Sequence, residues 1–420
     1  MSRLPRLTQL DNGLTVITDS MDAVETVSLG VWVDAGTRHE TPDVNGVSHL
    51  LEHMAFKGTE RRSARAIAEE IEAVGGMLNA YTSREQTAYY AKVLKEDSAL
   101  AVDIIADILQ HSVIDPEELA REQTVVLQEI NQALDTPDDI VFDYFQSTAY
   151  PDQAVGRPVL GTADSVMAMT SATLHGYMRQ HYSANRMVLT AAGRIEHEQL
   201  VDLAAQAFTA LPPARTPIIE PARYHGGDYR EDRDLEQVQW LLGFDGVRYD
   251  DPDFYNASVL STLLGGGMSS RLFQEVREKR GLVYSIYSYA SSYIDGGVFG
   301  VYAGTGAEEV TELVPVVCDE LMKATRQIEE VEVRRARAQI KAGILMALES
   351  SGSRCEQAAR QIQAYGRLIP IEEIVTKIDA VTPETVRACA ARLFQGRPTL
   401  TALGPLAGLE SFETTCARLG

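Results

Sequence analysis

Two histidines and a glutamate lie close together in the N-terminal part of the chain, in the order His49-Leu-Leu-Glu52-His53. On a helix, residues four positions apart share one face, so His49 and His53 can point their imidazole rings at the same place. Two such rings are two of the three protein ligands that a catalytic zinc ion requires. Glu52 stands beside the pair, where its carboxylate can take a proton from a water molecule at the metal. The order H-x-x-E-H is the inverse of the zincin motif H-E-x-x-H.

The same five residues also have a structural interpretation, in which a buried helix satisfies both histidines through hydrogen bonds in the core. The residues around them are apolar and fit a short helix in either case: Val47, Leu50, Leu51, Met54 and Phe56. The chain has only 8 histidines, and two of them stand here at ligand spacing, which favours a metal site.

A third ligand is expected on the long helix predicted for residues 115–134, which Pro116 opens. Glu122 and Glu129 are seven positions apart and therefore share a face. Val125 and Val126 are placed on the same stripe between them. Burying a carboxylate among apolar residues is costly unless it is paired or bound to a cation. We expect Glu129 to be the third ligand and Glu122 to orient a ligand histidine; a solvated acidic face is the alternative.

The composition indicates a soluble, globular protein of two domains. A chain of 420 residues is too long for one core of ordinary size. Hydrophobic residues make up 45% and charged residues 23% of it, which are ordinary values. No apolar run is long enough for a membrane span, and residues 1–9 lack the apolar part of a signal peptide. We expect a cytoplasmic protein, in which the scattered cysteines stay reduced: Cys318, Cys355, Cys389 and Cys416.

The net charge of −22 argues against nucleic acid as a partner, because binding phosphates requires a basic face. The same charge attracts cationic ligands if it is concentrated in a cleft, whereas solubility alone is the simpler interpretation. Four acids lie within nine residues: Asp135, Asp138, Asp139 and Asp143. They form either a turn with a helix cap or an anionic pocket close to the metal.

The order of elements in the first half recurs in the second. In the first half we predict a hairpin at 7–19, a strand at 24–35, the motif helix, a helix at 64–74 capped by Ser63, strands at 77–82 and 87–94, and a helix at 97–110. Four prolines within 212–221 indicate a linker, so the expected domains are 1–212 and 226–420, joined by 213–225. In the second half we predict strands at 237–244, 282–290 and 297–305 and helices at 253–264 and 271–280. Residues 256–264 replace the motif helix and contain no histidine or glutamate, so the second half is expected to be metal-free.

The second half must then contribute something else. Gly265-Gly266-Gly267 allows close approach of the backbone, without the pattern of a phosphate-binding loop. Arg277 and Tyr284 can grip a peptide carbonyl or stabilise an oxyanion. A surface arginine and a half-buried strand tyrosine are the plainer interpretation of that pair.

Over almost its whole length the chain resembles the superfamily of pitrilysin, insulinase and mitochondrial processing peptidase, most closely the bacterial processing-peptidase branch. Five segments carry the resemblance: HLLEHMAFKGT at 49–59, NAYTSREQT at 79–87, VVLQEI at 125–130, LGGGMSSRL at 264–272 and REKRGLVY at 277–284. The resemblance implies an α+β fold of two homologous halves, each an antiparallel sheet with helices. It implies a metal site in the first half only.

The resemblance also implies roles for individual residues. Zinc is held by His49, His53 and Glu129, with Glu52 as the general base and Glu122 behind a ligand. An edge strand binds an extended peptide by β-augmentation through Leu78, Asn79, Ala80 and Tyr81. In the processing peptidases two acids hold an arginine near the scissile bond, and by spacing these are Asp139 and Asp143. Arg277 and Tyr284 match a pair that contacts the substrate from the metal-free half.

The expected function is that of a zinc-dependent endopeptidase acting on extended peptides, with a preference for basic, arginine-containing, presequence-like substrates. The mitochondrial enzyme divides the metal site and the glycine-rich loop between two subunits, whereas this chain carries both. A homodimer is therefore the simplest assembly, and a heterodimer with a metal-free homologue is the alternative. A non-catalytic assembly subunit, like the core subunits of the respiratory cytochrome complex, and a peptide-binding module are the rival functions.

Overall fold

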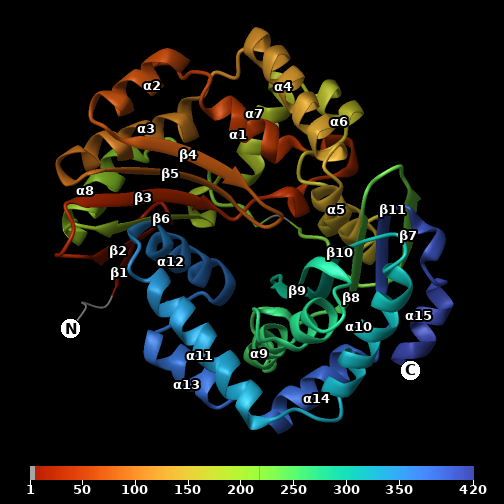
Figure 1. The fold of residues 1–420 in the computed structure, drawn as a ribbon. Coiled ribbons are helices and arrows are strands. Elements are labelled where there is room, and N and C mark those ends of the chain that lie inside the picture. The colour runs from red at the N-terminus through yellow and green to blue at the C-terminus, as the bar shows by residue number, and fades with distance from the viewer. Residues whose placement is uncertain (1–4, 217) are drawn as a thin grey trace. The chain divides into compact units, whose positions relative to one another are not determined.

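The computed structural model describes residues 5–216 and 218–420, which fold into two compact units (Figure 1). The first unit consists of the residues up to Gln132, Arg157–Glu220 and Met346–Leu368. The second consists of Ala133–Gly156, Pro221–Leu345 and Ile369–Gly420. Two parts of the chain lie outside the described residues. They are residues 1–4, which belong to the segment considered for a signal peptide, and residue 217, which belongs to the predicted linker.

The first unit is built on a six-stranded sheet with the order β1-β2-β6-β3-β5-β4. The strands are β1 (Arg6–Gln9), β2 (Thr15–Ser20), β3 (Thr26–Val33), β4 (Met77–Thr82), β5 (Thr87–Leu94) and β6 (Met187–Gly193). All neighbouring strands are antiparallel except β2 and β6, which are parallel. Strand β4 is the last in the order and therefore leaves one edge unpaired within the sheet.

Helices cover both faces of this sheet. They are α1 (Val47–Ala55), α2 (Ala64–Ala73), α3 (Ser98–His111), α4 (Pro116–Leu134), α6 (Ala163–Ala168), α7 (Ser171–His181), α8 (His197–Ala207) and α12 (Ser351–Tyr365). Neighbouring strand residues alternate between two cores: Val31 and Leu189 lie in the core with α3 and α8, and Trp32 and Val188 lie in the core with α12. Because both faces are covered, β3 and β6 are buried almost throughout and read as continuous apolar runs.

The five-stranded sheet of the second unit repeats the order of the first sheet from β2 to β4, without a counterpart of β1. Its strands are β7 (Gly227–Asp232), β8 (Val238–Asp245), β9 (Val283–Ser292), β10 (Gly297–Thr305) and β11 (Thr399–Gly404), in the order β7-β11-β8-β10-β9. The only parallel pair among these described strands is β7 and β11, which correspond to β2 and β6. This matching topology supports the predicted repeat and the two-part α+β architecture.

The helices of the second unit include the metal-free counterpart of α1. They are α5 (Pro137–Ala149), α9 (Phe254–Gly265), α10 (Val310–Ala324), α11 (Glu330–Ala347), α13 (Ile371–Asp379), α14 (Pro383–Leu393) and α15 (Phe412–Leu419). Helix α9 follows β8 as α1 follows β3. The helix predicted at 271–280 is a π-helix at Phe273–Glu278.

The compact units interleave along the chain, with one helix exchanged in each direction. Helix α5 comes from the first half of the sequence and packs on β8 and β11 of the second unit, where Phe145 lies against Gly243. Helix α12 comes from the second half and packs on β3 and β6 of the first unit; Figure 1 shows it in blue beside those strands. The predicted domains, 1–212 and 226–420, follow the repeat in the order of elements along the chain. Their bounds stay a prediction.

Among the described helices, none combines the length and the apolar character that crossing a membrane requires. Cys318, Cys355 and Cys389 are buried, Cys416 is partly exposed, and all four are free thiols.

Candidate metal centre

Helix α1 carries the two histidines, and a buried carboxylate fixes its first turn. Gly46 precedes the helix with φ +94°, and a Cβ there would lie 2.8 Å from the carbonyl oxygen of Leu160. Gly46 has no side chain to cap the helix. Glu40 does so instead, because its carboxylate accepts hydrogen bonds from the backbone amides of Gly46 (2.7 Å) and Ser48 (2.8 Å). The helix is thus anchored at the end nearest His49.

His49, His53 and Glu129 form the one group of metal-ligand side chains found among the described residues, with their ligand atoms all within 4.8 Å of one another. The Nε2 atom of His49 lies 3.5 Å from a carboxylate oxygen of Glu129, and that of His53 lies 3.6 Å from the same oxygen. The two rings are 4.7 Å apart between centroids. The pair four positions apart on α1 and the acid on α4 therefore converge as the sequence predicts.

The spacing of these three atoms fits a zinc ion. Ligands about 2.0–2.1 Å from a tetrahedral metal are separated from each other by roughly 3.3 Å. The observed 3.5 and 3.6 Å are close to that separation. The donor set of two imidazoles and one carboxylate is also a known set for catalytic zinc. The side chains keep 12% (His49), 18% (His53) and 38% (Glu129) of their surface exposed, so a small ligand can reach them.

The pKa of His49 favours the neutral, metal-binding form. Burial and, to a smaller extent, the neighbouring His53 together lower the pKa of its imidazole to about 4. A neutral imidazole has the free lone pair that a metal ion needs.

Glu52 lies on α1 between His49 and His53 in the sequence. Its carboxylate is fixed by a contact with the neighbouring sheet. The hydroxyl of Thr82, the last residue of β4, donates a hydrogen bond of 2.6 Å to its carboxylate. Burial raises the pKa of Glu52 above its ordinary value, although the bond from Thr82 and the nearby His53 oppose the rise. A half-buried carboxylate with a raised pKa is suited to accept and return a proton.

Glu122 lies behind His53, as predicted. The Nδ1 atom of His53 is 3.0 Å from Glu122, which leaves its Nε2 atom facing Glu129. Lys57 forms an ion pair of 2.6 Å with the other oxygen of Glu122. Burial would raise the pKa of Glu122, but the bonds with Lys57 and His53 outweigh it and hold the pKa below its ordinary value. The carboxylate thus stays charged and orients the ring.

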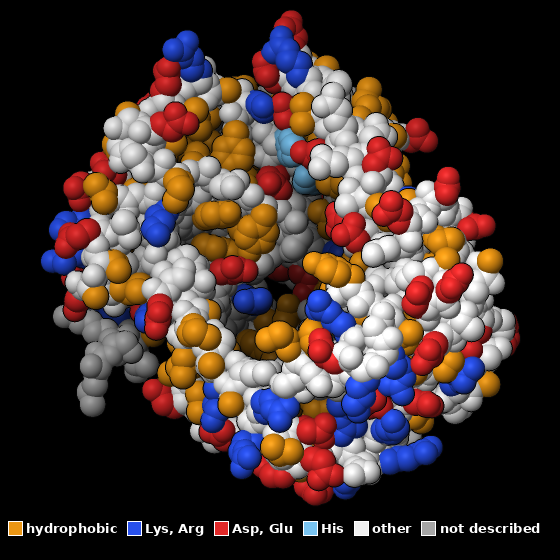
Figure 2. Space-filling view, in the orientation of Figure 1, with side chains coloured by type: hydrophobic (Ala, Val, Ile, Leu, Met, Phe, Trp, Pro, Cys, Tyr) orange, Lys and Arg blue, Asp and Glu red, His pale blue; other side chains and the backbone are white. Residues whose placement is uncertain are grey.

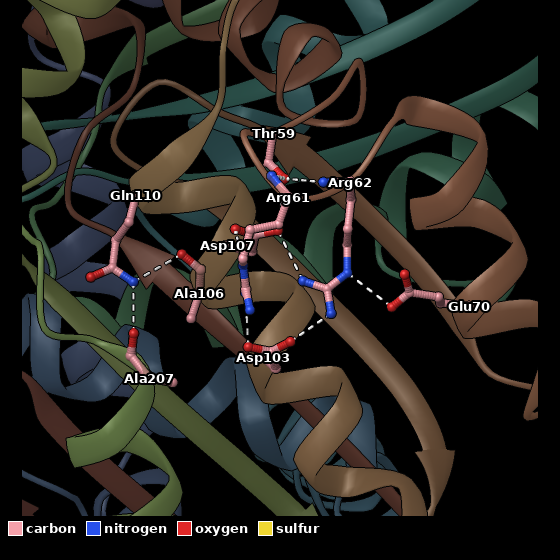
Figure 3. A network of polar contacts seen from close by, with 9 residues as sticks. All are labelled: Thr59, Arg61, Arg62, Glu70, Asp103, Ala106, Asp107, Gln110 and Ala207. Atoms are coloured by element: carbon pink, nitrogen blue, oxygen red, sulfur yellow. Dashed lines mark hydrogen bonds and ion pairs between the residues drawn. The ribbon is translucent and has the colours of Figure 1, made fainter.

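The loop after α1, which carries Lys57, is fastened to α3 by a network of ion pairs (Figure 3). Arg62 contacts Asp107 (2.9 Å), Asp103 (2.5 Å) and Glu70 on α2 (2.9 Å). Arg61 contacts the same two aspartates. The side chain of Asp107 is fully buried and also accepts a hydrogen bond from Thr59. This network fixes the course of the chain just after the metal-ligand helix.

Helix α4 differs from the prediction in one detail. Val126 is fully buried, but Val125 is 38% exposed and does not belong to the buried stripe. The inward face includes Gln123, whose side-chain amide bonds the carbonyl oxygens of Val166 and Met169. The argument from an apolar stripe through Val125 was therefore wrong, although the shared face of Glu122 and Glu129 is confirmed.

The four residues predicted to bind an extended peptide lie on β4, the edge strand of the first sheet. Ala80 is buried, Leu78 and Tyr81 are partly exposed and Asn79 is exposed. The hydroxyl of Tyr81 accepts a hydrogen bond from the indole of Trp32 (3.1 Å), which fixes its ring. Among the described strands β4 pairs only with β5, so its other edge has no strand partner.

The other predicted substrate residues lie in the second unit. Asp139 and Asp143 are one turn apart on α5. The guanidinium of Arg277 lies 4.8 Å from the ring centre of Phe273 and 5.5 Å from that of Tyr284. Tyr284 is 77% exposed, which contradicts a half-buried strand tyrosine. The partly exposed Arg277 and the exposed Tyr284 are therefore in contact.

On the face drawn in Figure 2, histidine side chains reach the surface beside acidic ones. The partial exposure of His49 and His53 agrees with this view. Sequence reasoning did not single out Lys57, Thr82 or Glu40, because each acts through a contact that only the folded chain creates.

Two imidazoles and a carboxylate beside a second, half-buried carboxylate are the side-chain types that the sites of zinc metallopeptidases use. A family model described as Insulinase (Peptidase family M16) matches residues 15–163, and one described as Peptidase M16 inactive domain matches residues 168–340. The chain belongs to this family.

Relatives agree with that assignment, and solved structures share the fold. The chain is 39% identical to an "Uncharacterized zinc protease" of Rickettsia felis, covering 95% of this chain and 97% of the relative. It is 38% identical to a "Probable mitochondrial-processing peptidase subunit beta" of Arabidopsis thaliana, covering 97% and 80%. A protease from Helicobacter pylori has the same fold, with a TM-score of 0.89, 21% identity and coverage of 96% and 100%. A chain of complex III2 from Candida albicans also shares it, with a TM-score of 0.87, 22% identity and 99% of each chain covered.

Proposed function

We propose that this protein is a zinc-dependent endopeptidase, with the ion held by His49, His53 and Glu129. The observation that carries the proposal is the convergence of these three side chains next to Glu52. The zinc proteases among its relatives support the choice of metal. An assembly subunit, the role that the resemblance to the core subunits of the respiratory cytochrome complex suggests, needs neither a complete ligand set nor a base beside it.

A bound zinc ion supplies a Lewis acid, which lowers the pKa of a water ligand towards ~7 and polarises a carbonyl group. Glu52 accepts the proton of the attacking water and delivers it to the leaving amine. Its raised pKa brings it closer to neutral pH, where the transfer in both directions is efficient. Glu122, charged and bonded to Nδ1 of His53, holds that ring in the tautomer with its lone pair on Nε2.

The substrate is an extended peptide that adds as a strand to the open edge of β4, along Leu78, Asn79, Ala80 and Tyr81. Main-chain hydrogen bonds then supply binding that does not depend on sequence, and side-chain pockets supply selectivity. Among the peptides, we propose a preference for those that contain arginine. The negative charge of Asp139 and Asp143 supports it, as do the relatives named mitochondrial-processing peptidase subunit beta.

Arg277 and Tyr284 bind the peptide main chain from the second unit, with the guanidinium over the Tyr284 ring holding the pair together. One chain carries both the proposed ligand set and the glycine-rich loop Gly265-Gly266-Gly267, so the proposed assembly is a homodimer. A heterodimer with a metal-free homologue is the alternative, and the mass of the purified protein in solution distinguishes the two. We also propose that the protein is cytoplasmic.

Substituting Glu52→Gln tests the proposal, because the amide has nearly the same shape and cannot accept the proton. We expect the variant to bind zinc as the wild type does, by elemental analysis, and to lose peptide turnover by orders of magnitude. The assay uses a basic, presequence-like peptide, with and without a chelator, and mass spectrometry of the products. Unchanged turnover in the variant would refute the role of Glu52. Binding without any cleavage in the zinc-loaded wild type would instead identify a peptide-binding module.

A further inference from the structure

A single hydrogen bond connects the edge strand to the general base. Thr82 is the last residue of β4 and directly follows the four residues proposed to pair with the peptide. Its hydroxyl lies 2.6 Å from Oε2 of Glu52 and 3.4 Å from the carbonyl oxygen of Ser48. A hydroxyl has one proton to donate, and the shorter distance assigns it to the carboxylate.

The sheet does not need this bond. The backbone of Thr82 is paired with Thr87 of β5, so the strand keeps its register without the hydroxyl. The helix does not need it either, because α1 is capped by Glu40 and packed through Leu50, Leu51 and Met54. What the bond does fix is the rotamer of Glu52, a flexible side chain that can otherwise swing away from the ligand histidines.

We propose that Thr82 is a positioning residue, which fixes the carboxylate of Glu52 relative to the strand that binds the peptide. The inference rests on the proposed role of Glu52 and extends it. A peptide paired with residues 78–81 of β4 lies at a defined distance from Thr82, and through it from the base. The strand thus sets both the register of the scissile bond and the position of the group that activates water.

The bond engages Oε2 only, which leaves Oε1 to exchange the proton. Losing it should therefore affect the chemical step and leave peptide binding intact. A hydrogen bond to a charged group is strong enough for its loss to lower kcat about tenfold or more. KM and the zinc content are expected to stay within about twofold of the wild type, because neither the edge of β4 nor the ligands change.

Three variants separate positioning from general structure. Thr82→Val keeps the shape of the side chain and removes the hydroxyl, whereas Thr82→Ser keeps the hydroxyl. We therefore expect Thr82→Ser to retain most of the wild-type kcat. The matched control is Thr87→Val, on the opposite strand, which loses a hydrogen bond of 2.9 Å to the carbonyl oxygen of Ala35. We expect Thr87→Val to lose thermal stability with kcat unchanged. A fall in kcat for Thr87→Val as large as that for Thr82→Val would overturn the proposal, and so would a failure of Thr82→Ser to restore it.

A double-substitution cycle supplies the second readout. In the Glu52→Gln background, adding Thr82→Val should leave the residual rate unchanged, because the base that Thr82 positions is already gone. The dissociation constant of an uncleaved peptide, measured on zinc-loaded Glu52→Gln protein, should also be unaffected by Thr82→Val. A wild-type kcat in Thr82→Val together with an inactive Glu52→Gln overturns this inference alone. Full activity in Glu52→Gln overturns the proposed role of Glu52 and, with it, this inference.

Discussion

The Nζ atom of Lys57 lies 2.6 Å from the carboxylate of Glu122, which in turn bonds Nδ1 of His53. Replacing Lys57 by Met removes the charge that keeps Glu122 ionised and in place. We expect zinc affinity to fall about tenfold or more, the usual effect of losing a group that orients a ligand. Competition with a chromogenic chelator measures it. Lys95→Met, which removes a surface ion pair with Glu25, is the control and should leave the affinity unchanged.

Asp139 and Asp143 on α5 predict a preference for a positively charged residue in the substrate, which a neutral analogue of arginine can test. If Asp139 and Asp143 hold an arginine, replacing that arginine by citrulline, which is neutral and of almost the same shape, should lower kcat/KM by about tenfold or more. Asp139→Asn and Asp143→Asn should lower kcat/KM for the arginine peptide and leave the citrulline peptide nearly unaffected. Equal losses for both peptides would show that the aspartates act on the fold and not on the substrate.

Glu40, which caps α1, is expected to contribute to the stability of the fold although it does not contact His49, His53 or Glu129. Glu40→Ala leaves the buried amides of Gly46 and Ser48 and the side-chain amide of Asn45 without this acceptor. We expect a loss of about 2 kcal/mol or more in the free energy of unfolding. Asp43→Ala, at an exposed acid three residues later, should change it by less than about 0.5 kcal/mol. Urea unfolding of both variants makes the comparison.

The ion-pair network after α1 predicts an acid-sensitive contribution to stability. Burial would raise the pKa of Asp107, but hydrogen bonds from Thr59, Arg62 and Arg61 outweigh it and lower the pKa. The folded pKa then lies below the unfolded value of ~3.9, so the unfolded chain binds more protons. The stabilisation is fully present well above pH ~3.9 and is lost as the pH falls through the folded pKa. Asp107→Asn should cost roughly 3 kcal/mol at pH 7, as for a broken buried ion pair.

The pH dependence checks the assignment. The difference in unfolding free energy between wild type and Asp107→Asn should narrow as the pH is lowered from 7 towards 3, because the wild-type aspartate becomes protonated. A difference that stays constant over that range would mean that the charge of Asp107 does not carry the stabilisation.

Features set by local sequence were predicted well. The strands β4 and β5 begin and end at the predicted residues, and Ser63 caps α2 as expected. The face shared by Glu122 and Glu129 follows from helix geometry alone, which is why both glutamates could be expected on the same side of α4 before the fold was known. Helical period constrains residues on one element, whatever surrounds them.

Contacts between distant elements could not be predicted in the same way. The bonds of Lys57 to Glu122 and of Thr82 to Glu52 join residues on different elements, and no spacing in the sequence relates them. The exposure of Val125 was missed because the polar Gln123 takes an inward position on α4. The exchange of α5 and α12 was missed because an amphipathic helix does not specify which sheet it covers.

The exchange of α12 bears on how the protein is made. Helix α12 packs on the face of the first sheet that includes Trp32 and Val188. The contact is made by Cys355, Ala358 and Ala359. As the ribosome synthesises the chain from its N-terminus, this apolar face stays uncovered until residues 351–365 have emerged. The first unit therefore cannot finish folding until most of the polypeptide has been translated, and during that interval the uncovered face is open to contacts with other chains.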